Sequence, residues 1–139
     1  MFFTGISLVS VVVAAIAAFI AGWLWYSPWL FGKMYNKEMG WTEEQMKKGP
    51  KLGMMKSFGI VFIAKIVMTI VAAALVNSLF VVSFSQILIL VLSLWTAFIV
   101  GPKLNDVLFG SRSWKYFLIT IGQDLLSVLV IFIVISLFS

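Results

Sequence analysis

The chain lacks cysteine and histidine altogether, and only 11% of its 139 residues are charged. Without these two residue types it cannot form a disulfide, a thiolate nucleophile, a Cys/His zinc site or a His-ligated haem. The commonest general base of enzymes is missing as well, which argues against hydrolytic and acyl-transfer catalysis. We therefore expect a protein that is not an enzyme, with no catalytic residues, no metal site and no cofactor.

Hydrophobic residues are abundant instead, at 63% of the chain, which is a membrane composition. The first apolar stretch, "ISLVSVVVAAIAAFIAGWLWY", has no basic residue before it and is longer than the apolar core of a signal peptide, so we interpret it as a retained span. A span needs roughly 20 apolar residues. The sequence predicts an all-α membrane protein, a single integral domain over 1–139 whose four transmembrane helices cover about 5–26, 57–79, 85–102 and 114–138.

The basic residues predict the orientation of these spans. Every Lys and Arg except Lys65 falls in the loops after the first and third spans, and none falls before the first span or between the second and third. Because such loops face the cytoplasm, both termini should lie on the non-cytoplasmic side. The net charge of +5 then reflects topology. We expect contact with the lipid bilayer and with anionic lipid headgroups on the cytoplasmic side, and no nucleic-acid partner.

The first cytoplasmic loop, residues 27–56, carries helix signals of its own. Ser27 before Pro28 is typical of an N-cap and first helical position, and Gly40 suits a helix end. A second short helix is predicted from Thr42 to the Gly-Pro pair at 49–50. We expect a short interfacial helix that dips aromatic rings into the membrane surface. Such a collar could set helix tilt, or it could serve as a gate or docking lid.

Two charges lie deep inside the predicted spans, Lys65 and Asp124, and a faint internal repeat aligns them. "AFIAG" at 18–22 matches "AFIVG" at 97–101, "LFGK" at 30–33 matches "LFGS" at 108–111, and "KSFGIVFIAK" at 56–65 aligns with "KYFLITIGQD" at 115–124. The pattern indicates a possible parallel duplication of a two-helix unit. In this alignment Lys65 falls on Asp124, so the two charges should lie at similar depth.

An isolated charge at bilayer depth costs at least ~2.5–3.5 kcal/mol, and an opposite charge nearby offsets much of it. We therefore predict an intramembrane pair between Lys65 and Asp124, with Gln123, Thr69 and Thr120 as possible polar neighbours. Lys65 could instead extend its stem toward the interface. The pair could be a structural clamp that sets helix register, or a proton- or ion-coupled site.

"GWLWYSPWLFGK" at 22–33, a four-span layout and "LFGSRSWKYFLITIG" at 108–122 resemble a widespread bacterial domain-of-unknown-function family of small four-span membrane proteins. The resemblance covers nearly the whole chain. It implies a multi-pass protein of the bacterial inner membrane, and it implies no particular activity. The family's signature, similar to G-x-x-W-Y-S-P-x-x-F-G-K, falls on Gly22, Trp25, Tyr26, Pro28, Phe31, Gly32 and Lys33.

Small residues and one proline complete the expectations. Ala14, Ala18 and Gly22 recur every four residues, a spacing that lets helix backbones approach closely in lipid. Pro102 should end or kink the third span. Two functional classes stay open. The first is a structural or accessory protein that forms a homo-oligomer or docks on a larger membrane complex. The second is a small transporter or channel-like protein that uses Lys65 and Asp124.

Overall fold

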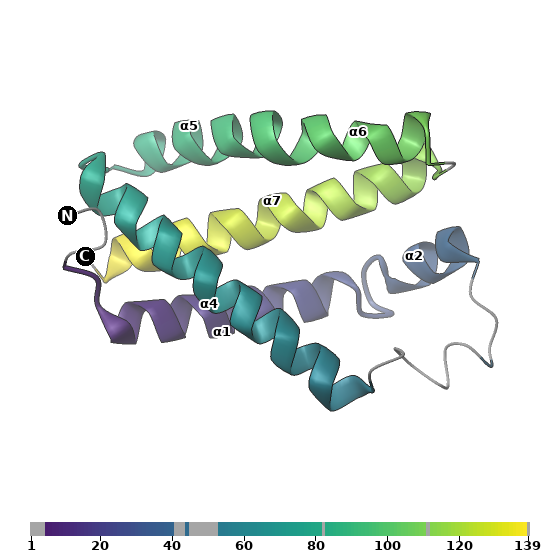
Figure 1. Ribbon diagram of the computed structural model, residues 1–139, viewed down its shortest axis with the longest axis horizontal. Coiled ribbons are helices and arrows are strands. Elements are labelled where there is room, and N and C mark those ends of the chain that lie inside the picture. Colours follow the sequence, from purple (N-terminus) through teal and green to yellow (C-terminus); the bar gives the residue numbers. More distant parts are fainter. Residues whose placement is uncertain (1–4, 41–43, 45–52, 82, 111, 139) are drawn as a thin grey trace.

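The computed structural model describes residues 5–40, 44, 53–81, 83–110 and 112–138, and within these ranges it contains helices and no strands (Figure 1). Four helical segments are long and apolar enough to cross a membrane, which confirms the all-α, four-span prediction. They are α1 (Leu8–Trp25), α4 (Met54–Ser78), the continuous segment Phe84–Leu108, and α7 (Trp114–Leu137). A short helix, α2 (Gly32–Met39), follows α1.

The last helix, α7, is the centre of the bundle. It packs against α1, α4, α2 and the third span, whereas the third span packs chiefly against α7. Successive spans run in opposite directions, and α4 crosses α1 and α7 obliquely (Figure 1). The start of α1 and the end of α7 therefore share one end of the bundle, which we call the terminal half. The other end, where α2 lies, is the α2 half.

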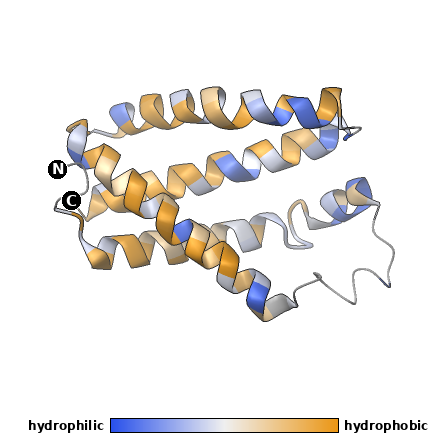
Figure 2. Ribbon diagram, viewed as in Figure 1, coloured by the Kyte–Doolittle hydropathy of each residue, from blue (hydrophilic) through white to orange (hydrophobic). Residues whose placement is uncertain are grey.

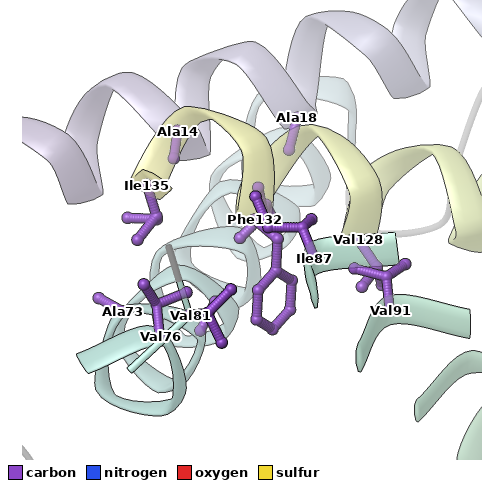
Figure 3. Packing of buried hydrophobic residues seen from close by; sticks show 12 residues of the cluster. Ala14, Ala18, Ala73, Val76, Val81, Ile87, Val91, Val128, Phe132 and Ile135 are labelled. Atoms are coloured by element: carbon purple, nitrogen blue, oxygen red, sulfur yellow. The ribbon is translucent and has the colours of Figure 1, made fainter. Parts of the chain in front are cut away.

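The terminal half holds a closely packed apolar core. Small side chains from α1 and α4, such as Ala14, Ala18 and Ala73, are at most 3% exposed and let these helices approach α7. Figure 3 shows Phe132 of α7 among aliphatic side chains of its neighbours. The buried cluster consists of Ala14, Ala18, Ala72, Ala73, Val76, Val81, Ile87, Val91, Val128, Ile131, Phe132 and Ile135.

The turn between α4 and the third span contains the one non-glycine residue with positive φ in the described chain. Phe80 has φ 54°, and the N–H of Val81 donates to the carbonyl of Val76. This is a Schellman helix ending, whose left-handed position usually holds glycine. The Phe80 side chain is 81% exposed, so this bulky residue gains little packing within the chain in return.

The third span continues past Pro102, so of the two predicted outcomes, an end or a kink, the end is wrong. It comprises α5 (Phe84–Trp95), a π-helical turn η1 (Thr96–Val100) and α6 (Gly101–Leu108). In η1 the N–H of Gly101 donates to the carbonyl of Thr96, five residues earlier. This wider turn lets the helix continue through the proline that follows it. The extra residue of the turn rotates α6 about the helix axis by about 100°. Lys103 consequently belongs to a helix, not to a loop.

The segment after α1 also differs from its prediction. Residues after Ser27 form a tight turn instead of a helix, and α2 begins only at Gly32. The Ser27 hydroxyl donates back to the carbonyl of Leu24 and does not cap a new helix. The predicted end is right, since Gly40 closes α2 with φ 71°. The second predicted helix, from Thr42 to 50, lies almost wholly outside the described residues.

Tertiary contacts hold α2 against the start of α7. The rings of Tyr35 and Tyr116 stack with centroids 5.9 Å apart, and the Ser113 hydroxyl donates to the Glu38 carboxylate at 2.5 Å. The Arg112 guanidinium lies over the Tyr116 ring, 5.1 Å from its centroid. The helix is therefore fixed by protein contacts. Of its two methionines, Met39 contacts Arg112 and Met34 is exposed, as are Trp29 and Leu30 just before the helix.

The predicted duplication has a local counterpart but a different packing. In both "LFG" elements the glycine lies tightly against backbone, Gly32 against the carbonyls of Tyr26 and Ser27 and Gly110 against that of Asp106. The helices that contain the repeats pack unequally, however. α1 has extensive contact with both α4 and α7, whereas its counterpart α5 packs mainly on α7. The duplication of a two-helix unit stays a prediction.

Candidate functional site

A cavity of about 420 Å³ opens in the α2 half between α1 and α4. Aromatic and aliphatic side chains of α1 and α4 form most of its wall, and α7 closes its inner side. The small size of Gly22 leaves room there, because a Cβ on this residue would lie 3.0 Å from the Gln123 amide nitrogen. The lining residues are Phe19, Gly22, Trp23, Tyr26, Ser27, Pro28, Phe58, Val61, Lys65 and Gln123.

Lys65 contributes the one charged side chain among these lining residues. Its Nζ donates to the Ser127 hydroxyl at 3.1 Å, and the Gln123 amide donates to the same oxygen at 2.6 Å. Ser127 is 1% exposed and Gln123 8% exposed, so this network is buried where α4 meets α7. Figure 2 shows the corresponding hydrophilic bands near the middle of α4 and α7.

The direct ion pair between Lys65 and Asp124 is not present, and this prediction needs correction. Asp124 forms its ion pair with Lys103 of α6, and the two side chains are 27% and 35% exposed respectively. Two features explain this pairing. The turn η1 rotates α6 so that Lys103 faces α7. Helical side chains also tilt toward the N-terminus of their helix, and this tilt directs the Lys103 side chain into the bundle. The charge of Asp124 still acts on Lys65, but without contact.

Of the three predicted polar neighbours, one belongs to the network. Gln123 reaches Lys65 through the Ser127 hydroxyl. Thr69 is fully buried, and its hydroxyl donates within α4 to the carbonyls of Lys65 and Ile66. Thr120 likewise donates to carbonyls of its own helix. Both threonines thus satisfy their hydroxyls locally and leave the charged groups to other partners.

Of the signature residues, Gly22, Tyr26 and Pro28 line the cavity, and Trp25 packs between α1 and α7. The indole N–H of Trp25 donates to the carbonyl of Ile119 at 3.0 Å. A Cβ on Gly122 would lie 2.8 Å from the Trp25 ring, so glycine is the residue that permits this contact. The Phe31 ring packs on the other side of Trp25 with centroids 4.4 Å apart. Trp25 therefore packs against the start of α7 and against Phe31.

The rest of the signature belongs to the turn after α1, which lines the cavity through Tyr26, Ser27 and Pro28. The N–H of Gly32 donates to the Ser27 carbonyl at 3.0 Å, and a Cβ on Gly32 would lie 2.2 Å from the Tyr26 carbonyl oxygen. No larger residue fits at this position. Pro28 lines the cavity, and Lys33 is exposed at the start of α2.

Tyr26 lies at the junction of the cavity and the aromatic contacts of α2. Its ring centroid is 4.7 Å from that of Tyr35. Burial, followed by the neighbouring Tyr35, raises the pKa of Tyr26 well above its ordinary value, and burial also raises the pKa of Tyr35. The Tyr26 hydroxyl therefore stays protonated at neutral pH and remains a hydrogen-bond donor.

Sequence reasoning missed the roles of Lys103 and Ser127. Asp124 lies ten residues into the fourth span, a depth that a lysine on the third span could also reach. Pro102 indicated a helix end just before Lys103, so Lys103 was assigned to a loop. Ser127 is small and uncharged, so its sequence position gave no sign of a polar contact with Lys65. In the described part of the chain, no cluster of three Asp or Glu side chains is placed to hold a metal ion.

Comparison with known proteins identifies a family. A family model described as "Protein of unknown function (DUF1761)" matches residues 9–136. This range contains all four spans except the first residue of α1 and the last of α7. No curated protein and no solved structure matches the chain.

Proposed function

The chain belongs to the DUF1761 family of proteins of unknown function, and we propose that it is an accessory membrane protein that binds a small membrane-soluble molecule between α1 and α4. The one-sided interior carries this proposal. A cavity opens in the α2 half, whereas the core of the terminal half is close-packed and the pocket beside Leu79 and Gln86 there is smaller, at about 280 Å³. Cavities of ~300–1,000 Å³ with mostly apolar walls and a few polar groups are typical of small-molecule sites.

The packed half also weighs against the alternative of a proton- or ion-coupled transporter or channel that uses Lys65 and Asp124. Passage across the membrane needs polar groups or space along the whole path. Beyond Ser127, the inward residues of α7 are apolar, among them Val128, Ile131 and Phe132, and they are at most 9% exposed. These side chains favour binding from one side over passage.

The basic residues support a particular orientation in the membrane. Lys33 and Lys37 of α2, Lys56 near the start of α4, and Arg112 and Lys115 near the start of α7 all lie in the α2 half. Cytoplasmic loops are enriched in such residues. We accordingly place the cavity toward the cytoplasmic leaflet of the bacterial inner membrane, with both termini on the other side.

A pair of tryptophan substitutions tests the binding function. Val61 lines the cavity, and Ile63, two residues further along α4, is 63% exposed. After gentle extraction into native lipid, mass spectrometry of the intact protein should detect a bound small molecule that Val61→Trp removes and Ile63→Trp retains. Identical spectra for the unmodified protein and both variants would rule out a ligand in this cavity.

Self-association is a second candidate, favoured by the third span. Only 11% of its most apolar window is buried, compared with 39% for α7. Its small residues Ser93, Ala97 and Gly101 are exposed at four-residue intervals, a pattern common at helix–helix contacts in lipid.

The cysteine-free chain offers a direct test of self-association. In dilute proteoliposomes, Ala97→Cys should cross-link into dimers and Val67→Cys, exposed on α4, should not. Equal cross-linking at both positions would mean random collision.

A further inference from the structure

The charges in the middle of the bundle do not balance. Two ammonium groups, Lys65 and Lys103, lie near one carboxylate, Asp124. Lys103 contacts that carboxylate directly, and within the described residues Lys65 contacts only the neutral Ser127 hydroxyl. One positive charge is therefore left over, and it belongs to the side chain that lines the cavity.

That excess charge lies deep. Lys65 is eleven residues beyond Met54, or about 16 Å along α4 from its first residue. The hydrocarbon core of a bilayer is ~30 Å thick, so a charge at this depth is costly without a counter-charge. Lys65 has three N–H donors, of which Ser127 receives one. An anion in the cavity would receive the others.

The remaining wall defines the body of such a ligand. Phe19, Phe58 and Trp23 present aromatic rings, with Phe19 and Phe58 in edge-to-face contact at 5.7 Å. A hydrated inorganic ion would lose its water against these walls without replacement. An organic anion with an apolar body would bury that body against them. Gln123 and Tyr26 also line the cavity, and their amide and hydroxyl groups are of the kind that donates hydrogen bonds to an anion.

We propose that the cavity binds a lipophilic carboxylic acid, with its carboxylate at Lys65 and its apolar body among the aromatic rings of α1 and α4. This inference rests on the proposed binding function and names its ligand class. A compact carboxylate suits the depth better than the headgroup of a phospholipid, which is anchored by its glycerol at the membrane surface. Such an acid reaches the cavity by partitioning into the bilayer.

The test compares dodecanoate with dodecanol, probes of equal chain length that differ in charge. Each is titrated into the protein in nanodiscs of zwitterionic lipid, and occupancy is measured by intact-protein mass spectrometry per mole of probe in the lipid. The unmodified protein should prefer dodecanoate at least ~10-fold, since hydrogen bonds to a charged group discriminate by about that factor. Lys65→Met should abolish the preference and leave dodecanol binding unchanged.

Matched variants separate charge from fold and from cavity. Lys56→Met removes an exposed lysine from the same helix and should keep the preference. Lys65→Arg keeps the positive charge and should also keep the preference for dodecanoate. If Lys65→Met does not fold, the comparison is made between Lys65→Arg and the unmodified protein. Equal binding of both probes by the unmodified protein would overturn the carboxylate inference while leaving the binding function intact. Binding of both probes that Val61→Trp does not reduce would overturn the binding function itself.

Discussion

The two halves of this bundle are built from the same four spans but differ in the side chains that fill the space between them. In the terminal half, alanines and branched aliphatic residues bring the helices close, and side chains such as Phe132 fill the interior. In the α2 half, α1 and α4 diverge around a cavity, and polar groups cluster beside it. Close packing and the capacity to bind are thus separated along the length of the same helices.

The largest expected effect is a loss of packing in the terminal half. Phe132→Ala should lower the free energy of unfolding by about 2–4 kcal/mol, because it leaves a void in a packed site while lipid offers little compensation. The control is Phe98→Ala on the third span, where the side chain is 73% exposed and the loss should stay within ~0.5 kcal/mol. Unfolding in mixed micelles measures both. Equal losses would mean that the terminal half is not the stabilising half.

The next effect concerns the ion pair at the border of the two halves. Asp124→Asn should cost about 1–3 kcal/mol, less than for a fully buried pair because both partners are partly exposed. A double-mutant cycle then distinguishes the two lysines. The double variant Asp124→Leu/Lys103→Met should recover part of the stability that Asp124→Leu alone loses. The double variant Asp124→Leu/Lys65→Met should not recover it. Stronger coupling to Lys65 would contradict the assigned pairing.

A pair of glycines probes close approach in the α2 half. Gly122→Ala should cost about 1–3 kcal/mol because its Cβ would meet the Trp25 ring at 2.8 Å. Gly59→Ala on α4 is the matched control, since nothing lies within 4 Å of its Cβ, and it should be neutral or stabilise by up to ~1 kcal/mol. Thermal unfolding of the two variants would settle the contrast, and a shared response would mean that α1 and α7 are not in contact there.

The smallest effect lies in the turn after α4. Phe80→Gly should raise the free energy of unfolding by up to ~1 kcal/mol, since glycine adopts φ 54° without strain. The exposed Leu79→Gly change beside it, where φ is −95°, is the control and should not stabilise. A loss of stability in Phe80→Gly would show that the phenyl ring makes a stabilising contact that outweighs the strain.

A structural feature could be predicted from the sequence when it depended on the residues of a single short segment. The four spans were evident from apolar length alone, and Gly40 was recognised as a helix end because that preference belongs to the residue itself. The prediction for Pro102 also used the preference of the residue itself, and here it was wrong about the end of the third span. A proline normally ends a helix, and only the π turn before it allows the third span to continue. The same turn determined which lysine meets Asp124.

Hydropathy and charge act residue by residue, so the amino-acid sequence was enough to establish the membrane class, the number of spans, the gathering of cations at one end and the need to shelter two intramembrane charges. Three outcomes came from the packed structure alone. Asp124 pairs with Lys103, Lys65 lines a cavity and donates to Ser127, and the signature residue Trp25 packs against α7. Those outcomes depend on helix rotation and crossing, which arise from side-chain packing between segments far apart in the chain.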